Sequence, residues 1–380
     1  MKKDPPSEQL HPIISLFTQG QLQQALSKAT QMLERFPHSV VLYNITGACN
    51  AGLMQFDAAI NSYKQAIKIK PDYAEAYYNM SVALNDKGDL EAAIESYKRA
   101  LKIKPAYAQA YNNMGNIQKD KGDLEAAIES YKKAIKIKPD YADAHNNMGI
   151  ALNHKGDLDA AISSYKQALK IKPDYAQACN NMGNTLKEKG DLNAAISSYK
   201  RALKIKPAYA QAYNNMGNIQ KDKGDLEAAI ESYKKAIKIK PDYADAHNNM
   251  GIALNHKGDL DAAISSYKQA LKIKPDYAQA FSNMGNILKE KGDLKAAINS
   301  YKQALKIKPD WAEVYSDLGG VLLLLNQTEQ ALVSYEKAIS LKKDLNAAIS
   351  GLGMALLKKG EHSEGLDKLR QSEGSILFNI

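Results

Sequence analysis

An identical internal copy constrains the fold of this chain more than any other feature of its sequence. The stretch from Ser96 to Ala178 returns letter for letter from Ser198 to Ala280, 102 residues later. That interval holds three periods of 34 residues, and the same period continues on both sides with substitutions. Such a period predicts an array of small structural repeats, each packed only against its neighbours, rather than one globular core.

One repeat, residues 74–107, predicts two antiparallel helices. Apolar side chains recur at helical spacing in its first half and again between Leu90 and Ile103. Between these stretches, Gly88 can take the left-handed conformation that ends a helix, and Asp89 can accept the N–H groups that open the next one. Pro105 ends the second helix because proline cannot donate the helical hydrogen bond.

These residues resemble the tetratricopeptide repeat family, in which a bulky residue, Leu-Gly, Tyr, Ala, an aromatic residue and Pro recur at fixed offsets. The matching residues of this repeat are Tyr77, Met80, Ser81, Leu84, Ala93, Tyr97 and Pro105. Later repeats restore the glycine, as Gly115, Gly149, Gly183, Gly217, Gly251 and Gly285. The resemblance implies an all-α fold, a right-handed α-solenoid or superhelix of about eleven helix-turn-helix repeats.

The predicted organisation is a polar leader at 1–9, a single superhelix over 6–371 and an apolar tail at 372–380. The first helix of the opening repeat is expected to start at Pro12, because proline fits a first helical turn. The tail either folds back on the last helix pair or begins a further domain. The predicted repeats are 6–39, 40–73, 74–107, 108–141, 142–175, 176–209, 210–243, 244–277, 278–311, 312–345 and 346–371.

Function is expected on a polar strip that the first helices share. We number the places of each repeat from its first residue. The second, fifth, sixth, ninth, twelfth and thirteenth places fall within an arc of roughly 120° on a helical wheel, and none is expected to serve packing. The tetratricopeptide resemblance implies that this strip lines the concave surface. The sixth place is asparagine in seven consecutive repeats, at Asn79, Asn113, Asn147, Asn181, Asn215, Asn249 and Asn283.

An asparagine row suits an extended peptide, because each carboxamide offers donors and an acceptor to backbone N–H and C=O groups. One such bond is worth only about 0.5–1.5 kcal/mol, so several repeats must act together. Asparagine is also a mediocre helix former, which favours binding over the alternative that a tolerated polar residue was copied by duplication. The candidate peptide-binding residues are Asn79, Asn112, Asn113, Asn116, Asn146, Asn147, Asn180, Asn181, Asn184, Asn214, Asn215, Asn218, Asn248, Asn249, Asn283 and Asn286.

The row is expected to stop at both irregular ends, where Ile45, Asp317 and Gly351 occupy the sixth place. It also resembles the tetratricopeptide region of O-linked N-acetylglucosamine transferases, whose asparagines hold substrate backbones. The catalytic domain that follows the repeats in that family has no counterpart in these 380 residues. The resemblance therefore implies peptide holding and says nothing for sugar transfer.

No catalytic, cofactor or metal site is expected. His145 and His247 replace a packing tyrosine, and no histidine has a nucleophile and a carboxylate at a recognisable spacing. Cys49 and Cys179 occupy packing positions, so both are expected to be buried thiols. The sequence thus predicts that the chain is not an enzyme.

The net charge of +9 is expected to reflect a solvated outer face rather than a nucleic-acid groove. In the second helices acidic residues come first and lysines last, which complements the helix dipole, and no aromatic residues alternate with the lysines for base stacking. No apolar run approaches the length of a membrane span, and the first nine residues lack a signal-peptide core. We therefore expect no nucleic acid, no membrane span and a reduced cytoplasmic setting.

The sequence favours a non-enzymatic scaffold that binds extended protein segments in a concave groove lined by asparagines. One alternative is the substrate-recruiting arm of a larger modifying enzyme, such as a glycosyltransferase, which an open reading frame past Ile380 would support. A second alternative is self-assembly, because identical surfaces 102 residues apart present the same patch twice. The sequence names neither the peptide nor the oligomeric state, and it does not tell whether the duplication is natural or engineered.

Overall fold

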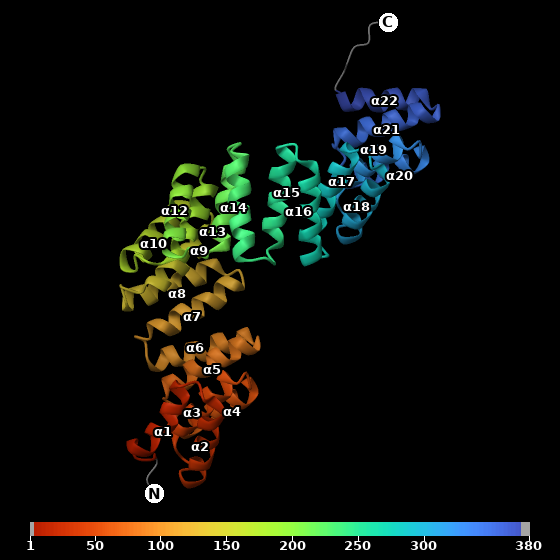
Figure 1. Ribbon diagram of the computed structural model, residues 1–380. Coiled ribbons are helices and arrows are strands. Elements are labelled where there is room, and N and C mark those ends of the chain that lie inside the picture. Colours follow the sequence, from red (N-terminus) through yellow and green to blue (C-terminus); the bar gives the residue numbers. More distant parts are fainter. Residues whose placement is uncertain (1–3, 374–380) are drawn as a thin grey trace. The chain divides into compact units, whose positions relative to one another are not determined.

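The computed structural model describes residues 4–373, and all regular secondary structure in this range is helical (Figure 1). Its 22 helices form eleven antiparallel pairs joined by short turns, as the sequence predicts. The first helices are α1 (Ser7–Thr18), α3 (Val40–Gly52), α5 (Ala74–Lys87), α7 (Ala108–Asp120), α9 (Ala142–Lys155), α11 (Ala176–Glu188), α13 (Ala210–Asp222), α15 (Ala244–His256), α17 (Ala278–Glu290), α19 (Ala312–Leu324) and α21 (Asn346–Lys359). The second helices are α2 (Leu22–Arg35), α4 (Phe56–Ile69), α6 (Leu90–Ile103), α8 (Leu124–Ile137), α10 (Leu158–Ile171), α12 (Leu192–Ile205), α14 (Leu226–Ile239), α16 (Leu260–Ile273), α18 (Leu294–Ile307), α20 (Thr328–Leu341) and α22 (His362–Glu373).

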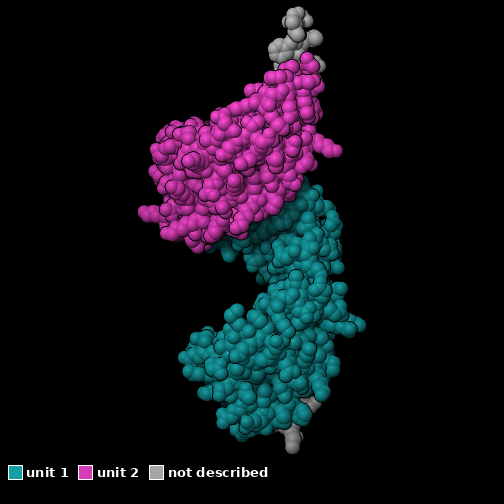
Figure 2. Space-filling view, turned by 90° about the vertical axis from the view of Figure 1, so that its right-hand side faces the viewer, with its two compact units in different colours: residues 1–198 teal, residues 199–380 magenta. Residues whose placement is uncertain are grey.

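The chain divides into two compact units, unit 1 at residues 1–198 and unit 2 at residues 199–380 (Figure 2). Within each unit, a helix packs against its partner in the pair and against the next repeat, so each unit is a solenoid of stacked helix pairs. The boundary falls inside α12. The single superhelix over 6–371 and its right-handed sense stay predictions.

The turn between the two helices of a repeat has the predicted chemistry. Gly88 has a φ of 93°, in the left-handed region that favours glycine. Asp89 follows as the N-cap of α6, and its Oδ1 accepts a hydrogen bond of 3.3 Å from the backbone N–H of Ala92. The predicted second helix, Leu90 to Ile103, is confirmed at both ends.

A buried tyrosine on each regular second helix explains the repeated glycine. Tyr131 is fully buried, and a Cβ added to Gly115 of the facing first helix would lie 2.7 Å from its Cε1 atom. A side chain at this place must shift the ring or the helices, so glycine favours the close approach, although α5 has Ser81 there opposite Tyr97. The most deeply buried tyrosines of this kind are Tyr63, Tyr97, Tyr131, Tyr165, Tyr199, Tyr233, Tyr267 and Tyr301.

The first helix begins earlier than predicted. It starts at Ser7 and carries Pro12 inside it, so the expected start at Pro12 is wrong. Tertiary packing explains the difference, because Ile13 is only 1% exposed and belongs to the first hydrophobic cluster. The helix thereby includes residues 7–9 of the predicted leader, and Asp4 accepts a 2.6 Å hydrogen bond from the hydroxyl of Ser39.

The last described helix, α22, has a largely exposed outer surface that includes Leu366 at 44%. Residues 372 and 373 of the predicted apolar tail belong to this helix. The rest of the predicted tail, 374–380, lies outside the described residues, and so does the prediction that it either folds back or begins a further domain.

Candidate peptide-binding surface

Burial separates the asparagines of the fifth, sixth and ninth places. The sixth-place asparagines and the ninth-place residues Asn116, Asn184 and Asn218 are partly exposed, and Asn286 is exposed. The fifth-place carboxamides are buried, so the prediction that none of these side chains serves packing is wrong for them. Their exposed fractions are 4% for Asn112, 1% for Asn146, 6% for Asn180, 5% for Asn214 and 3% for Asn248.

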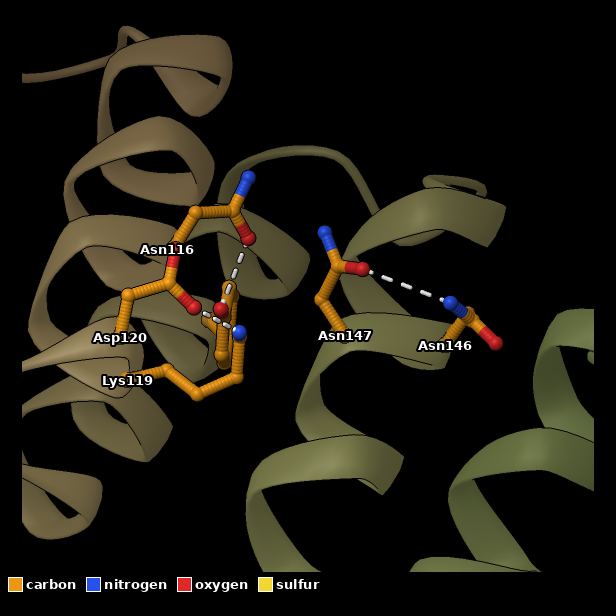
Figure 3. Close-up of polar contacts among 6 residues, drawn as sticks. Asn116, Lys119, Asp120, Asn146 and Asn147 are labelled. Atoms are coloured by element: carbon orange, nitrogen blue, oxygen red, sulfur yellow. Dashed lines mark hydrogen bonds and ion pairs between the residues drawn. The ribbon is translucent and has the colours of Figure 1, made fainter. Parts of the chain in front are cut away.

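The buried and partly exposed asparagines are hydrogen-bonded to each other across neighbouring repeats. Asn147 donates from Nδ2 to Oδ1 of Asn112, one repeat earlier, at 3.1 Å. Within each of three repeats, the fifth-place Nδ2 donates to the sixth-place Oδ1, as Figure 3 shows for Asn146 and Asn147 at 3.4 Å. We call this linked set of fifth-place and sixth-place side chains the amide chain. Further bonds of this kind join Asn181 to Asn146 (3.1 Å), Asn249 to Asn214 (3.1 Å) and Asn283 to Asn248 (3.3 Å).

The amide chain reaches one repeat farther toward the N-terminus than the sequence analysis expected. Asn79 donates to Oδ1 of Asn44 at 2.9 Å, and Asn113 donates to the hydroxyl oxygen of Tyr78 at 3.1 Å. Ile45 does interrupt the sixth-place row, but Asn44 continues the chain from the fifth place. The signal was present in the sequence, because Asn44 aligns with Asn112 and its equivalents.

The ninth-place asparagines Asn116, Asn218 and Asn286 accept hydrogen bonds from buried tyrosines. The hydroxyl of Tyr131 donates to Oδ1 of Asn116 at 2.8 Å, which leaves the amide nitrogen of Asn116 pointing away from the ring (Figure 3). Burial raises the pKa of Tyr131, and the charge of Asp120 raises it further. The equivalent bonds join Tyr233 to Asn218 (2.8 Å) and Tyr301 to Asn286 (2.6 Å).

Hydrogen-bonding capacity remains at the partly exposed edge of the amide chain. A carboxamide has two N–H donors and an oxygen with two lone pairs. At Asn113 and Asn147 the bonds of the amide chain use one N–H and one lone pair each. At Asn147 the second N–H and the second lone pair are therefore left for water or a ligand, in an orientation fixed by the repeats on either side, whereas Asn113 also has a hydrogen bond with Tyr97.

Charged and polar side chains at the twelfth and thirteenth places form contacts near the C-terminal ends of the first helices. Lys119 contacts Asp120 in the same helix (Figure 3), and Asn153 donates to Oε2 of Glu188 at 3.0 Å in the next repeat. In unit 2, Lys289 lies 3.1 Å from Asp317, the residue that ends the sixth-place row. Both signs of charge thus alternate at this end of the strip.

Two pockets open on the first-helix face of unit 1. The apolar pocket has a volume of about 370 Å³ and is lined by Ile14, Phe17, Asn44, Ile45, Ala48 and Asn79. The polar pocket has a volume of about 340 Å³ and is lined by Val82, Asn85, Tyr97, Asn113, Asn116, Ile117 and Asp120. Three candidate residues, Asn79, Asn113 and Asn116, therefore lie in pocket walls, whereas Ile14 and Phe17 were not among the predicted site residues.

Within residues 4–373, no three His, Cys, Asp or Glu side chains are grouped so that they could hold a metal ion. His145 has a packing role, with Nε2 3.2 Å from the carbonyl oxygen of Pro139. Both cysteines are buried as predicted, and burial raises the pKa of the Cys49 thiol to about 11. None of the helices in this described range has the length and apolar character that crossing a bilayer requires.

Two family models match the sequence along most of its length. The model described as "TPR repeat" matches residues 55–84, 82–122, 115–153, 151–190, 183–224, 217–255, 253–292 and 285–326. The model described as "Tetratricopeptide repeat" matches residues 312–345.

Similar proteins were found at the level of both sequence and structure. A probable UDP-N-acetylglucosamine–peptide N-acetylglucosaminyltransferase SEC of Arabidopsis thaliana is 32% identical over 76 residues, which is 20% of this chain and 8% of that protein. A chain of the APC/C hetero-tetramer Cut9–Hcn1 shares the fold, with 15% identity and a TM-score of 0.53. The match covers 92% of the present chain and 83% of that chain. YrrB, a TPR protein described as having an unusual peptide-binding site, matches 50% of this chain and 97% of its own, with 26% identity and a TM-score of 0.42.

Proposed function

Because the chain belongs to the tetratricopeptide repeat family, we propose that it is a non-enzymatic scaffold that binds extended segments of other proteins along the amide chain. The observation that carries this proposal is the partly exposed sixth-place row, whose carboxamides are already oriented by bonds to the fifth place. Such orientation lowers the entropy lost when a ligand binds. The bound strand would satisfy the outward N–H and C=O groups that the amide chain leaves available.

The burial of the fifth place divides the candidate residues into two roles. Asn112, Asn146, Asn180, Asn214 and Asn248 would support the row from beneath rather than touch the peptide. The sixth-place asparagines, together with Asn116, Asn184, Asn218 and Asn286 at the ninth place, remain the candidates for direct contact. Each contact is worth about 0.5–1.5 kcal/mol, so useful affinity needs several repeats in the same complex.

A pull-down from cell extract with the intact chain tests this proposal, repeated with Asn113, Asn147, Asn181, Asn215 and Asn249 changed to alanine. We expect the multiple variant to lose the partners while circular dichroism shows the same helix content. The matched control changes the exposed second-helix lysines Lys98, Lys132, Lys166, Lys200 and Lys234 to alanine, and it should keep the partners. Partners retained at full strength by the asparagine variant would overturn the proposal.

A second candidate function keeps the same surface but places it in a larger enzyme, as an arm that recruits protein substrates. The 32% identity to part of a probable N-acetylglucosaminyltransferase favours it, although the match spans only 8% of that protein. The test is to isolate the native gene product and measure its mass and its sugar-transfer activity toward the captured partners. A product the size of this chain, without such activity, would exclude the arm.

A further inference from the structure

The two pockets of unit 1 differ in chemistry and lie next to each other on the first-helix face. The apolar pocket is walled by α1, α3 and α5, and the polar pocket by α5 and α7 with Tyr97 of α6. Asn79 lies in the first pocket and Asn113 in the second, and these are consecutive members of the sixth-place row. A strand that follows the row would therefore pass both pockets.

The apolar pocket presents large side chains to solvent beside hydrogen-bonding groups. Ile14 is 42% exposed and Phe17 is 37% exposed, and both face the pocket that Asn44 and Asn79 also line. Exposed apolar surface with a polar rim is typical of interaction sites. An apolar side chain entering this pocket would cover the exposed surface of Ile14 and Phe17 while its backbone remained beside the Asn44–Asn79 bond.

The charged groups in and beside the polar pocket sum to one negative charge. Asp120 lines it, and Asp86 adjoins it by accepting a 3.3 Å hydrogen bond from Asn85, whereas Lys119 is the cation in contact with Asp120. The neighbouring lysines, Lys87 and Lys121, are held elsewhere by ion pairs with Asp57 and Glu91 on the second helices. Two carboxylates and one ammonium group leave one negative charge, which a basic side chain would complement.

The spacing of the pockets sets how far apart the two ligand side chains must be. Neighbouring helices lie about 8–10 Å apart. The apolar pocket is centred on α3 and the polar pocket between α5 and α7, so they are offset by about one and a half helix spacings, and along the helix axis by roughly 3–5 Å, as from Asn79 to Val82. The pockets are thus about 12–16 Å apart. An extended chain rises about 3.3 Å per residue, so this distance corresponds to about four or five residues.

We propose that unit 1 selects extended segments that carry one apolar side chain and one basic side chain about four or five residues apart. This inference rests on the proposed function and adds the class of sequence that the surface prefers. The apolar side chain occupies the pocket of Ile14 and Phe17, and the basic side chain occupies the pocket of Asp120. The amide chain binds the intervening backbone without regard to its side chains.

Fluorescence anisotropy with labelled 12-residue peptides tests the preference, using the full chain. The parent peptides carry one leucine and one lysine, about four or five residues apart and in either order, in a background of serine and alanine. In the better-binding order, we expect replacement of the leucine by serine, or of the lysine by glutamate, to weaken binding at least tenfold. Equal binding of the parent and both replaced peptides would overturn the inference.

Variants of the protein separate this inference from the proposed function. Phe17→Ser should remove the preference for leucine, and Asn85→Lys, the residue found at the equivalent place 187, should remove the preference for lysine over glutamate. Asp120→Asn should also reduce the preference for lysine. Its matched control is Asp222→Asn, because both residues lie in the identical copied sequence and only Asp120 lines the pocket.

Peptides that bind without either preference, but whose binding still depends on Asn113 and Asn147, would contradict the inference and leave the proposed scaffold function intact. Peptide binding that is unchanged when those two asparagines are replaced by alanine would contradict the proposed scaffold function itself.

Discussion

Asn147 donates a hydrogen bond of 3.1 Å from its Nδ2 to the Oδ1 of Asn112, which lies one repeat earlier in the chain. The acceptor is 4% exposed and the donor is partly exposed, so the pair joins the packed interior of the repeat interface to its surface. Residues of the candidate binding surface thus also hold neighbouring repeats together. Changes at the fifth place should act on stability and on binding at once.

Asn112→Ala should lower the free energy of unfolding by about 1–3 kcal/mol, because it removes a buried carboxamide that bonds to both Asn113 and Asn147. Urea unfolding followed by circular dichroism measures the effect, and Asn214→Ala in the identical copy should behave alike. Gln109→Ala, at an exposed place on the same helix, serves as the control and should leave the midpoint unchanged. A midpoint for Asn112→Ala that matches the Gln109 control would refute a structural role for the amide chain.

Gly149→Ala should destabilise the chain by about 1–3 kcal/mol through overpacking, since the new Cβ would lie 2.6 Å from Cε1 of Tyr165. Gly156→Ala provides the comparison, because its Cβ would meet nothing within 4 Å and only the backbone at φ 90° is strained. Combining each change with Tyr165→Leu and measuring unfolding gives the coupling. We expect a coupling energy at Gly149 and none at Gly156, and additivity at both sites would show that the ring does not set the helix spacing.

The repeat architecture was predictable because local and long-range signals agree at each turn. Gly88, Asp89 and Pro105 mark the helix ends, and the structure places them there. The start of α1 was not predictable from local rules, because Pro12 argues against an interior position that the packing of Ile13 nevertheless maintains. Local chemistry determined the regular repeats, and tertiary contacts decided the terminal one.

The candidate site was predictable only in part. A helical wheel places Asn112 and Asn113 on the same face, but it does not show which of them the next repeat covers. The structure buries Asn112 and leaves Asn113 partly exposed, and the hydroxyl of Tyr131 engages Asn116 from the second helix. These relationships depend on how helices stack, which the pattern of a single helix does not contain.

Raising the pH above 10 should destabilise the chain through its buried tyrosines. Burial raises the pKa of Tyr131 and Tyr233, and burial together with the charge of Asp317 raises the pKa of Tyr335 from 10.0 to about 12. A raised pKa in the folded state means that the contribution to stability is fully present below pH 10 and is lost as pH rises from 10 toward the folded value. Each such tyrosine removes up to about 1.4 kcal/mol per pH unit in this window.

Urea unfolding at pH 8 and at pH 11 measures this loss. The control is Tyr131→Phe, which lacks an ionisable hydroxyl and also loses the bond to Asn116. It should be less stable than the native chain at pH 8 and should lose less stability between pH 8 and pH 11. An equal loss in both proteins would contradict the assignment to Tyr131.

An ion pair between neighbouring repeats should set the titration of Glu91. The hydrogen bond from Lys121, together with the backbone N–H of Glu91 and the lysine charge, holds the pKa of this carboxyl below its usual 4.5. A lowered folded pKa means that the stabilising contribution is present above pH 4.5 and is lost as the pH falls through the folded value. Lys121→Ala should therefore raise the pKa of Glu91 toward 4.5.

Carboxyl carbon NMR with labelled glutamate measures this pKa, and added salt should reduce the shift because both side chains are exposed. Glu227 offers an internal control, since Lys257 lowers its pKa in the same way in unit 2. Lys121→Ala should leave the Glu227 titration unchanged. An unchanged Glu91 pKa in Lys121→Ala would show that the ion pair with Lys121 does not lower the pKa of Glu91.

Met54 and Asn326 adopt φ angles of 60° and 59° at the place where the regular repeats have glycine. Such a backbone is strained for residues with a side chain, by about 1–2 kcal/mol. The turn between the two helices nevertheless forms in both repeats. The packing of the helices therefore determines the backbone conformation of this turn, and glycine only relieves its strain. A scan that recognises tetratricopeptide units by the glycine of this turn would consequently overlook the repeats at 40–73 and 312–345, which keep the glycines that face the buried tyrosines, Gly47 and Gly319. Motif definitions for such arrays should therefore be based on the interlocking side chains.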